Sequence, residues 1–144
     1  MPLNLIKLCV GIDELQELRD WQGQRLARMR AVGERPQLRH VTRSWPRRAD
    51  EVLEGGSLYW VIKGVIRARQ PVAGFEEVLD PQEGIRRCAI LLAEELVETE
   101  GRPCRAFQGW RYLEAKDAPP DRPAGGDSDL PAEMEAELRA LGIL

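Results

Sequence analysis

The stretch GGSLYWVIKGVIRARQ, residues 55–70, joins aromatic and β-branched residues to three cations and carries a glycine at its centre. Aromatic and β-branched side chains favour extended backbone, so residues 57–70 are predicted to be strand. A glycine inside a strand, here Gly64, usually marks a bend or a bulge. We expect one strongly bent strand, because Lys63-Gly64 lacks the Asn-Gly or Asp-Gly chemistry of a tight turn. A hairpin pairing SLYWVIK with VIRARQP is the alternative.

Before this stretch, the sequence alternates between strand and helix signals. Apolar LNLIKLCV predicts a strand over 3–10, and apolar residues at helical spacing predict an amphipathic helix over 13–32, opened by a capping-box pattern at Asp13. LRHVTRS predicts a strand over 38–44, and PRRADEVLE a short helix over 46–54 that ends at two glycines.

After this stretch, GIRRCAILLA and AFQGWRYL predict strands over 84–93 and 106–113. FEEVLDPQEG, residues 75–84, is expected to be a connection, and EELVETEGRPCR, residues 94–105, to be irregular. About five strands with two intervening helices predict an α+β domain with a small curved sheet, mixed or antiparallel.

The chain is predicted to contain one domain followed by two C-terminal segments. Residues 1–113 form the domain, and 114–129 form an acidic linker rich in Pro and Gly. An amphipathic helix is expected over 130–144, with its apolar stripe on Leu130, Met134, Leu138 and Leu141.

The net charge of −3 conceals an uneven distribution. Residues 19–48 hold nine arginines and two carboxylates, whereas residues 114–144 hold eight carboxylates and three cations. Such segregation indicates a polyanion site partly shielded by an acidic tail, with a solvated helix face as the alternative.

Aromatic residues are interleaved with the cations, which is the combination that binds single-stranded nucleic acids by stacking and phosphate contacts. Because Tyr59 and Trp60 point to opposite faces of a strand, at least one of them is expected in the core. The candidate nucleic-acid-binding residues are Arg43, Trp45, Arg47, Tyr59, Lys63, Arg67, Arg69, Trp110 and Arg111.

The residue types that hold metals or act as nucleophiles are sparse. His40 is the single histidine and is expected to be a hydrogen-bonded structural residue. Cys9 and Cys88 are expected in the core and Cys104 at the surface, and no paired spacing predicts a metal site or a cofactor site. No phosphate-binding, dinucleotide or nucleophile-elbow motif occurs.

The sequence also predicts where the protein resides. No apolar run reaches the roughly 20 residues that span a bilayer, and the N-terminus has no secretory leader, so no membrane partner is expected. Three widely spaced cysteines predict reduced thiols and a cytoplasmic location.

The blocks HVTRSWPRRADEVLEGGSLYWVIKG and FQGWRYL resemble a bacterial family known only as a domain of unknown function, over the chain to about Ala118. The short helix, Val52-Leu53-x-Gly55 and the following strand are distantly similar to the ASCH and EVE relatives of the PUA domain. That likeness implies a small curved pseudo-barrel that binds RNA or modified bases. The lysine and Glu-x-Arg of the ASCH pattern do not follow Gly55, so only the fold carries over.

These observations favour an RNA- or nucleotide-binding PUA-like domain. The first alternative is a small enzyme acting on a nucleic acid or nucleotide through Asp50, Glu51 or Glu54 near Arg47 or Lys63. The second is an interaction module whose C-terminal helix contacts a partner protein or a second copy of the chain.

Overall fold

The computed structural model describes residues 2–122, which form a seven-stranded mixed, open sheet with two helices. The elements of the N-terminal half are β1 (Asn4–Leu8), α1 (Leu15–Ala31), β2 (Leu38–Thr42), α2 (Ala49–Val52) and β3 (Ser57–Ile62). Those of the C-terminal half are β4 (Val65–Leu79), β5 (Arg86–Leu92), β6 (Val97–Pro103), β7 (Trp110–Leu113) and the 3₁₀ helix η1 (Ala115–Asp117). The predicted α+β class is confirmed, whereas the helix predicted over 130–144 lies outside the described residues.

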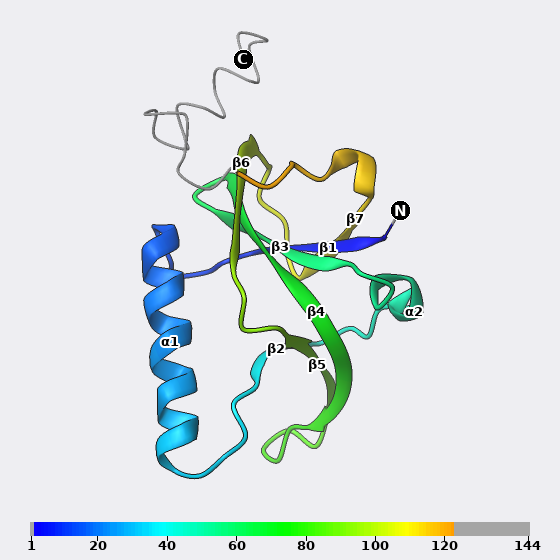
Figure 1. Cartoon of the computed structure of the whole chain (residues 1–144). Coiled ribbons are helices and arrows are strands. Elements are labelled where there is room, and N and C mark those ends of the chain that lie inside the picture. The colour runs from blue at the N-terminus through cyan, green and yellow to red at the C-terminus, as the bar shows by residue number, and fades with distance from the viewer. Residues whose placement is uncertain (1, 123–144) are drawn as a thin grey trace, which may run out of the picture.

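The strand order is β2-β5-β4-β3-β1-β7, and β6 pairs with β4 beside this path. Figure 1 shows the long, curved β4 running the length of the sheet, with α1 and α2 on opposite sides of it. The first part of β4 pairs with β3 and β6, and its second part pairs with β5. Register shifts between Ile66 and Ala68 and between Val72 and Gly74 interrupt these ladders, and such irregularities bend a strand.

The expected single bent strand over 57–70 is wrong, and the hairpin is correct. β3 and β4 pair antiparallel, with Ile62 opposite Val65. Lys63 and Gly64 form the two-residue turn with φ values of 49° and 75°. Two positive φ values match the type I′ turn, whose twist suits a hairpin, and here lysine occupies the place usually taken by Asn or Asp.

Two further segments that were expected to lack regular structure form strands. Residues 75–79 continue β4 rather than forming a connection, and residues 97–103 form β6 rather than irregular chain. Both segments contain many charged residues, whose exposed side chains hide the strand signal. The capping box expected at Asp13 is also absent, since helix α1 has Glu14 as its N-cap with no side-chain hydrogen bond.

Alternation along β3 divides the apolar residues between two clusters. Leu58, Trp60 and Ile62 face the main core, which includes Leu18 and Leu26 of α1. Tyr59 and Val61 face a smaller cluster with Ile6 and Ile66. Both rings of the Tyr59-Trp60 pair are therefore buried, on opposite faces of the sheet.

Buried amides attach α1 to the sheet. Gln22 and Gln70 exchange two hydrogen bonds through their side-chain amides, at 3.0 and 2.9 Å. Trp60 Nε1 also donates to Gln70 Oε1 at 3.2 Å. Buried polar groups are costly unless they are paired. Because the pairing requires Gln22 to lie opposite Gln70, this network specifies where α1 packs on the sheet and also stabilises that packing.

No helix in residues 2–122 combines the length and the apolar character needed to cross a bilayer.

Candidate functional site

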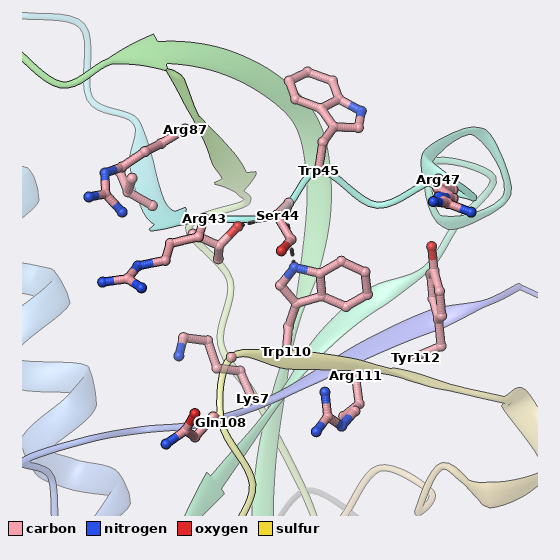
Figure 2. A pocket seen from close by; sticks show the side chains of 13 residues that line it. Lys7, Arg43, Ser44, Trp45, Arg47, Arg87, Gln108, Trp110, Arg111 and Tyr112 are labelled. Carbon is pink, nitrogen blue, oxygen red and sulfur yellow. Dashed lines mark hydrogen bonds between the residues drawn. The ribbon is translucent and has the colours of Figure 1, made fainter. Parts of the chain in front are cut away.

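A basic cleft of about 1010 Å³ lies between the two end strands of the sheet (Figure 2). Its walls come from β1, the end of β2 and the chain that follows it, β5, and β7 with the turn before it. The lining residues are Lys7, Val41, Thr42, Arg43, Ser44, Trp45, Arg47, Arg87, Gln108, Gly109, Trp110, Arg111 and Tyr112.

Hydrogen bonds connect the two sides of this basic cleft. Trp110 Nε1 donates to the backbone oxygen of Ser44 at 3.0 Å, and the backbone N–H of Arg48 donates to Tyr112 Oη at 3.0 Å. The rings of Trp110 and Tyr112 pack edge to face with centroids 5.0 Å apart. β7 is therefore held against the β2–α2 connection although the two do not share a strand ladder.

The basic cleft is lined by five cations and by no carboxylate in the described part of the chain. Arg87 is neutralised, because Asp80 lies 3.4 Å and Glu83 2.8 Å from its guanidinium. Lys7, Arg43, Arg47 and Arg111 form no ion pair within residues 2–122. Unpaired cations in one concavity attract anions and raise their local concentration.

Trp45 is the accessible ring of the basic cleft. It is 49% exposed, and its ring packs at a tilt against the ring of Phe75, with the two centroids 6.0 Å apart. In Figure 2 its indole projects from the chain between β2 and α2, while Trp110 lies on the other side of Ser44 with its indole nitrogen toward that residue. An exposed indole that is backed by another ring offers a flat face for stacking.

Five of the nine sequence-predicted residues meet in the basic cleft, namely Arg43, Trp45, Arg47, Trp110 and Arg111. The other four lie elsewhere. Tyr59 is buried in the smaller cluster, where burial raises the pKa of its phenol. Lys63 lies in the β3–β4 turn, and Arg67 and Arg69 lie on β4 outside the cleft.

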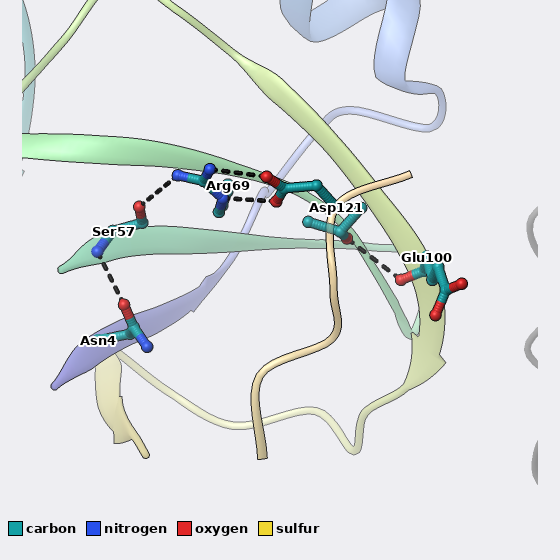
Figure 3. A network of polar contacts seen from close by, with 6 residues as sticks. Asn4, Ser57, Arg69, Glu100 and Asp121 are labelled. Carbon is teal, nitrogen blue, oxygen red and sulfur yellow. Dashed lines mark hydrogen bonds and ion pairs between the residues drawn. The ribbon is translucent and has the colours of Figure 1, made fainter. Parts of the chain in front are cut away.

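Arg69 makes structural contacts instead (Figure 3). Its guanidinium binds both carboxylate oxygens of Asp121, at 2.7 and 2.8 Å, and donates to Ser57 Oγ at 3.0 Å. This pairing lowers the pKa of the Asp121 carboxyl. Next to Asp121, the N–H of Glu100 donates to the oxygen of Pro120, so residues 120–122 run along β6.

Sequence reasoning did not select Lys7 and Arg87 for the site. Gln108 and Tyr112, which belong to the FQGWRYL block, line it as well. The signal that could have identified Lys7 is its place inside the apolar run LNLIKLCV, because lysine is rarely buried without a partner. Arg87 gave no such signal, because it belongs to a charged strand end.

A second cavity, of about 380 Å³, lies between α1 and the strands β1 and β2. His40 lines it, and the described residues 2–122 do not supply the expected structural hydrogen bond, because none of them pairs with the buried His40 Nε2. Burial, together with a smaller effect of the nearby Lys7, lowers the pKa of His40 to about 4. The same burial raises the pKa of the neighbouring Cys9 thiol to about 11, so this cysteine is protonated and unreactive at neutral pH.

The carboxylates considered for catalysis lie outside the basic cleft. Asp50, Glu51 and Glu54 are all exposed. Glu51 forms an ion pair with Arg48, which lowers the pKa of the Glu51 carboxyl. Glu51 and Glu54 line a small pocket of about 280 Å³ together with Glu114, but no group of metal-ligating side chains occurs in residues 2–122.

Comparison with known proteins places the chain in a family without assigning it an activity. No curated protein and no solved structure gives a significant match. The model of one family matches residues 5–144, which is nearly the whole chain. The chain therefore belongs to the family described as "Protein of unknown function (DUF1489)".

Proposed function

We propose that the protein binds a nucleotide unit in the basic cleft, as part of single-stranded RNA or as a free nucleotide. One observation carries the proposal: four cations without ion-pair partners in residues 2–122 line the same cavity as an exposed indole, and no carboxylate of that part of the chain lines it. A phosphate next to a flat base has the matching chemistry.

The residues divide into two roles. Lys7, Arg43, Arg47 and Arg111 contact phosphate oxygens, and the three arginines do so through bidentate guanidinium groups. Trp45 stacks a base, since its indole is half exposed while Trp110 is held by Ser44.

The shape of the sheet supports a PUA-like architecture as part of this proposal. The sheet is open, strongly curved along β4, and joined across its two ends by the Trp110–Ser44 hydrogen bond. A pseudo-barrel of that kind, which the ASCH and EVE likeness implies, would use the gap between its end strands as the ligand site.

Fluorescence anisotropy with a labelled single-stranded RNA of mixed sequence tests the proposal. We expect binding at low salt that weakens as salt rises, because bound phosphates release counterions. Arg43→Gln and Arg47→Gln are each expected to reduce the logarithmic salt slope by about 0.7 to 1. Arg28→Gln, on the exposed part of α1, is the matched control and is expected to leave the slope unchanged.

Competition distinguishes the two sources of the ligand. If a mononucleotide displaces the labelled RNA at a concentration comparable to that of unlabelled RNA, the ligand is a free nucleotide. If only unlabelled RNA displaces it, the ligand is the polymer. Trp45→Ala is expected to weaken binding by about 5- to 100-fold if its indole stacks a base. Absence of binding at low salt, or an equal effect of Arg28→Gln, contradicts the proposal.

A further inference from the structure

We propose that the second cavity is a separate binding site for a small amphipathic anion, a molecule with an apolar body and one carboxylate. This inference does not rest on nucleotide binding, because it uses a different cavity and different apolar residues. The two cavities share Lys7.

The cavity has the size and walls of a small-molecule site. Its volume of about 380 Å³ falls within the range of ligand pockets, which are mostly apolar with a few polar groups. The walls come from β1 and the chain after it, α1, β2, β3 and β5. The apolar lining residues are Leu8, Cys9, Val10, Ile12, Leu18, Trp21, Leu38, Trp60 and Leu92.

Exposed apolar side chains mark the entrance. Val10 is 87% exposed and Trp21 is 49% exposed, and both line the cavity. The guanidinium of Arg25 lies 5.2 Å from the centre of the Trp21 ring, which keeps a further cation at this edge. Single exposed apolar residues are common, but two that border an apolar cavity form a surface that a ligand would cover.

The charges around the cavity select an anion. Lys7 and Arg39 are its lining cations, and no carboxylate of the described residues lines it. Arg39 has one distant partner, Glu76 at 3.9 Å, and Lys7 forms no ion pair in residues 2–122. An ammonium group beside an apolar wall is suited to a carboxylate attached to an apolar body.

His40 provides the observation that packing alone leaves unexplained. It lines the cavity, and among residues 2–122 its buried Nε2 has no hydrogen-bond partner, although buried polar atoms are nearly always paired. Its ring packs edge-on against Trp60, with centroids 5.4 Å apart. The low pKa, about 4, keeps the imidazole neutral at physiological pH, so the wall accepts an apolar body without burying a charge beside it.

The single histidine also makes the test simple. In the full-length protein labelled with ¹⁵N, the imidazole resonances of His40 are the only ones of their kind, so they need no assignment by mutagenesis. We propose titrating this protein with octanoate and, separately, with 1-octanol, and following the His40 signals by NMR.

We expect a saturable shift of the His40 resonances, with octanoate binding about tenfold more tightly than 1-octanol because of the contact with Lys7. Lys7→Met is expected to remove this preference. Lys116→Met, which deletes an exposed lysine outside the cavity, is expected to retain it. Trp21→Ala, at a half-exposed position, is expected to weaken the binding of both ligands.

Unchanged His40 resonances at about 1 mM octanoate overturn the proposal. Equal affinity for the acid and the alcohol in the unsubstituted protein overturns it as well, because the cavity then has no preference for an anion. Neither result affects the RNA titration, whose readout is a labelled oligonucleotide.

Discussion

The indole N–H of Trp110 donates to the backbone oxygen of Ser44 at 3.0 Å, although the two residues are 66 positions apart. This bond joins β7 to the chain after β2, the two ends of the strand order, and forms the back of the basic cleft. The basic cleft therefore depends on joining the two ends of an open sheet by side-chain contacts rather than by a strand ladder.

Trp110→Phe tests this contact. The substitution keeps an aromatic ring beside Tyr112 but removes the donor, so the free energy of unfolding is expected to fall by about 1 kcal/mol. Urea denaturation followed by circular dichroism measures the change. Trp45→Phe is the control, because the Trp45 indole N–H makes no hydrogen bond within residues 2–122, and a loss as large as that of Trp110→Phe would contradict the assignment.

The β3–β4 turn offers a stabilising substitution. Lys63 has φ of 49°, a conformation that costs less for asparagine than for lysine. Lys63→Asn is therefore expected to raise the free energy of unfolding by about 0.5 to 1 kcal/mol, in the sequence Asn-Gly that a type I′ turn prefers. Lys116→Asn, in the exposed η1 segment, is expected to show no gain, and a loss for Lys63→Asn would argue against the turn geometry.

Gly56 is predicted to be intolerant of any side chain. A Cβ atom at this position would lie 2.1 Å from the backbone oxygen of Leu3 and 2.6 Å from that of Val52. Because these atoms are backbone and cannot move aside, Gly56→Ala is expected to destabilise the protein by at least about 3 kcal/mol or to prevent soluble expression.

Gly23 supplies the matched control for Gly56. It lies within α1, where an added Cβ would meet nothing within 4 Å. Gly23→Ala is expected to raise the free energy of unfolding by about 0.5 to 1 kcal/mol, because alanine is the better helix former. Equal destabilisation by the two substitutions would contradict the close packing of Gly56 against the backbone oxygens of Leu3 and Val52.

His40 should make stability depend on pH. Its pKa is about 4 in the folded protein and about 6.5 in an unfolded chain, so in this interval the unfolded state binds more protons. The free energy of unfolding is therefore expected to decrease as pH falls from 6.5 to 4, by roughly 2 to 3 kcal/mol from this residue. The measurement is thermal or urea unfolding across this range, compared with His40→Gln, in which that part of the pH dependence is expected to disappear.

Local patterns predicted most of the regular structure. The apolar run around Leu5 and the helical spacing of Leu15, Leu18 and Leu26 led correctly to β1 and α1. They failed at β6, where only Thr99 and Gly101 are buried and the remaining residues give no apolar alternation. They also failed at the β3–β4 turn, where Lys63 occupies the position usually taken by Asn or Asp.

The sequence by itself determined the α+β class, the segregation of charge and the burial of at least one ring of Tyr59-Trp60, because these follow from residue type and periodicity along a few adjacent positions. Only the tertiary structure decided which cations share the basic cleft and that His40 lines a second cavity, with no hydrogen-bond partner for its Nε2 in the described part of the chain. Arg43 and Arg69 look alike in the sequence, yet one is left in an open cleft and the other is bound by Asp121. That difference arises from contacts between residues far apart in the chain, which depend on sheet curvature and cannot be read from neighbouring residues.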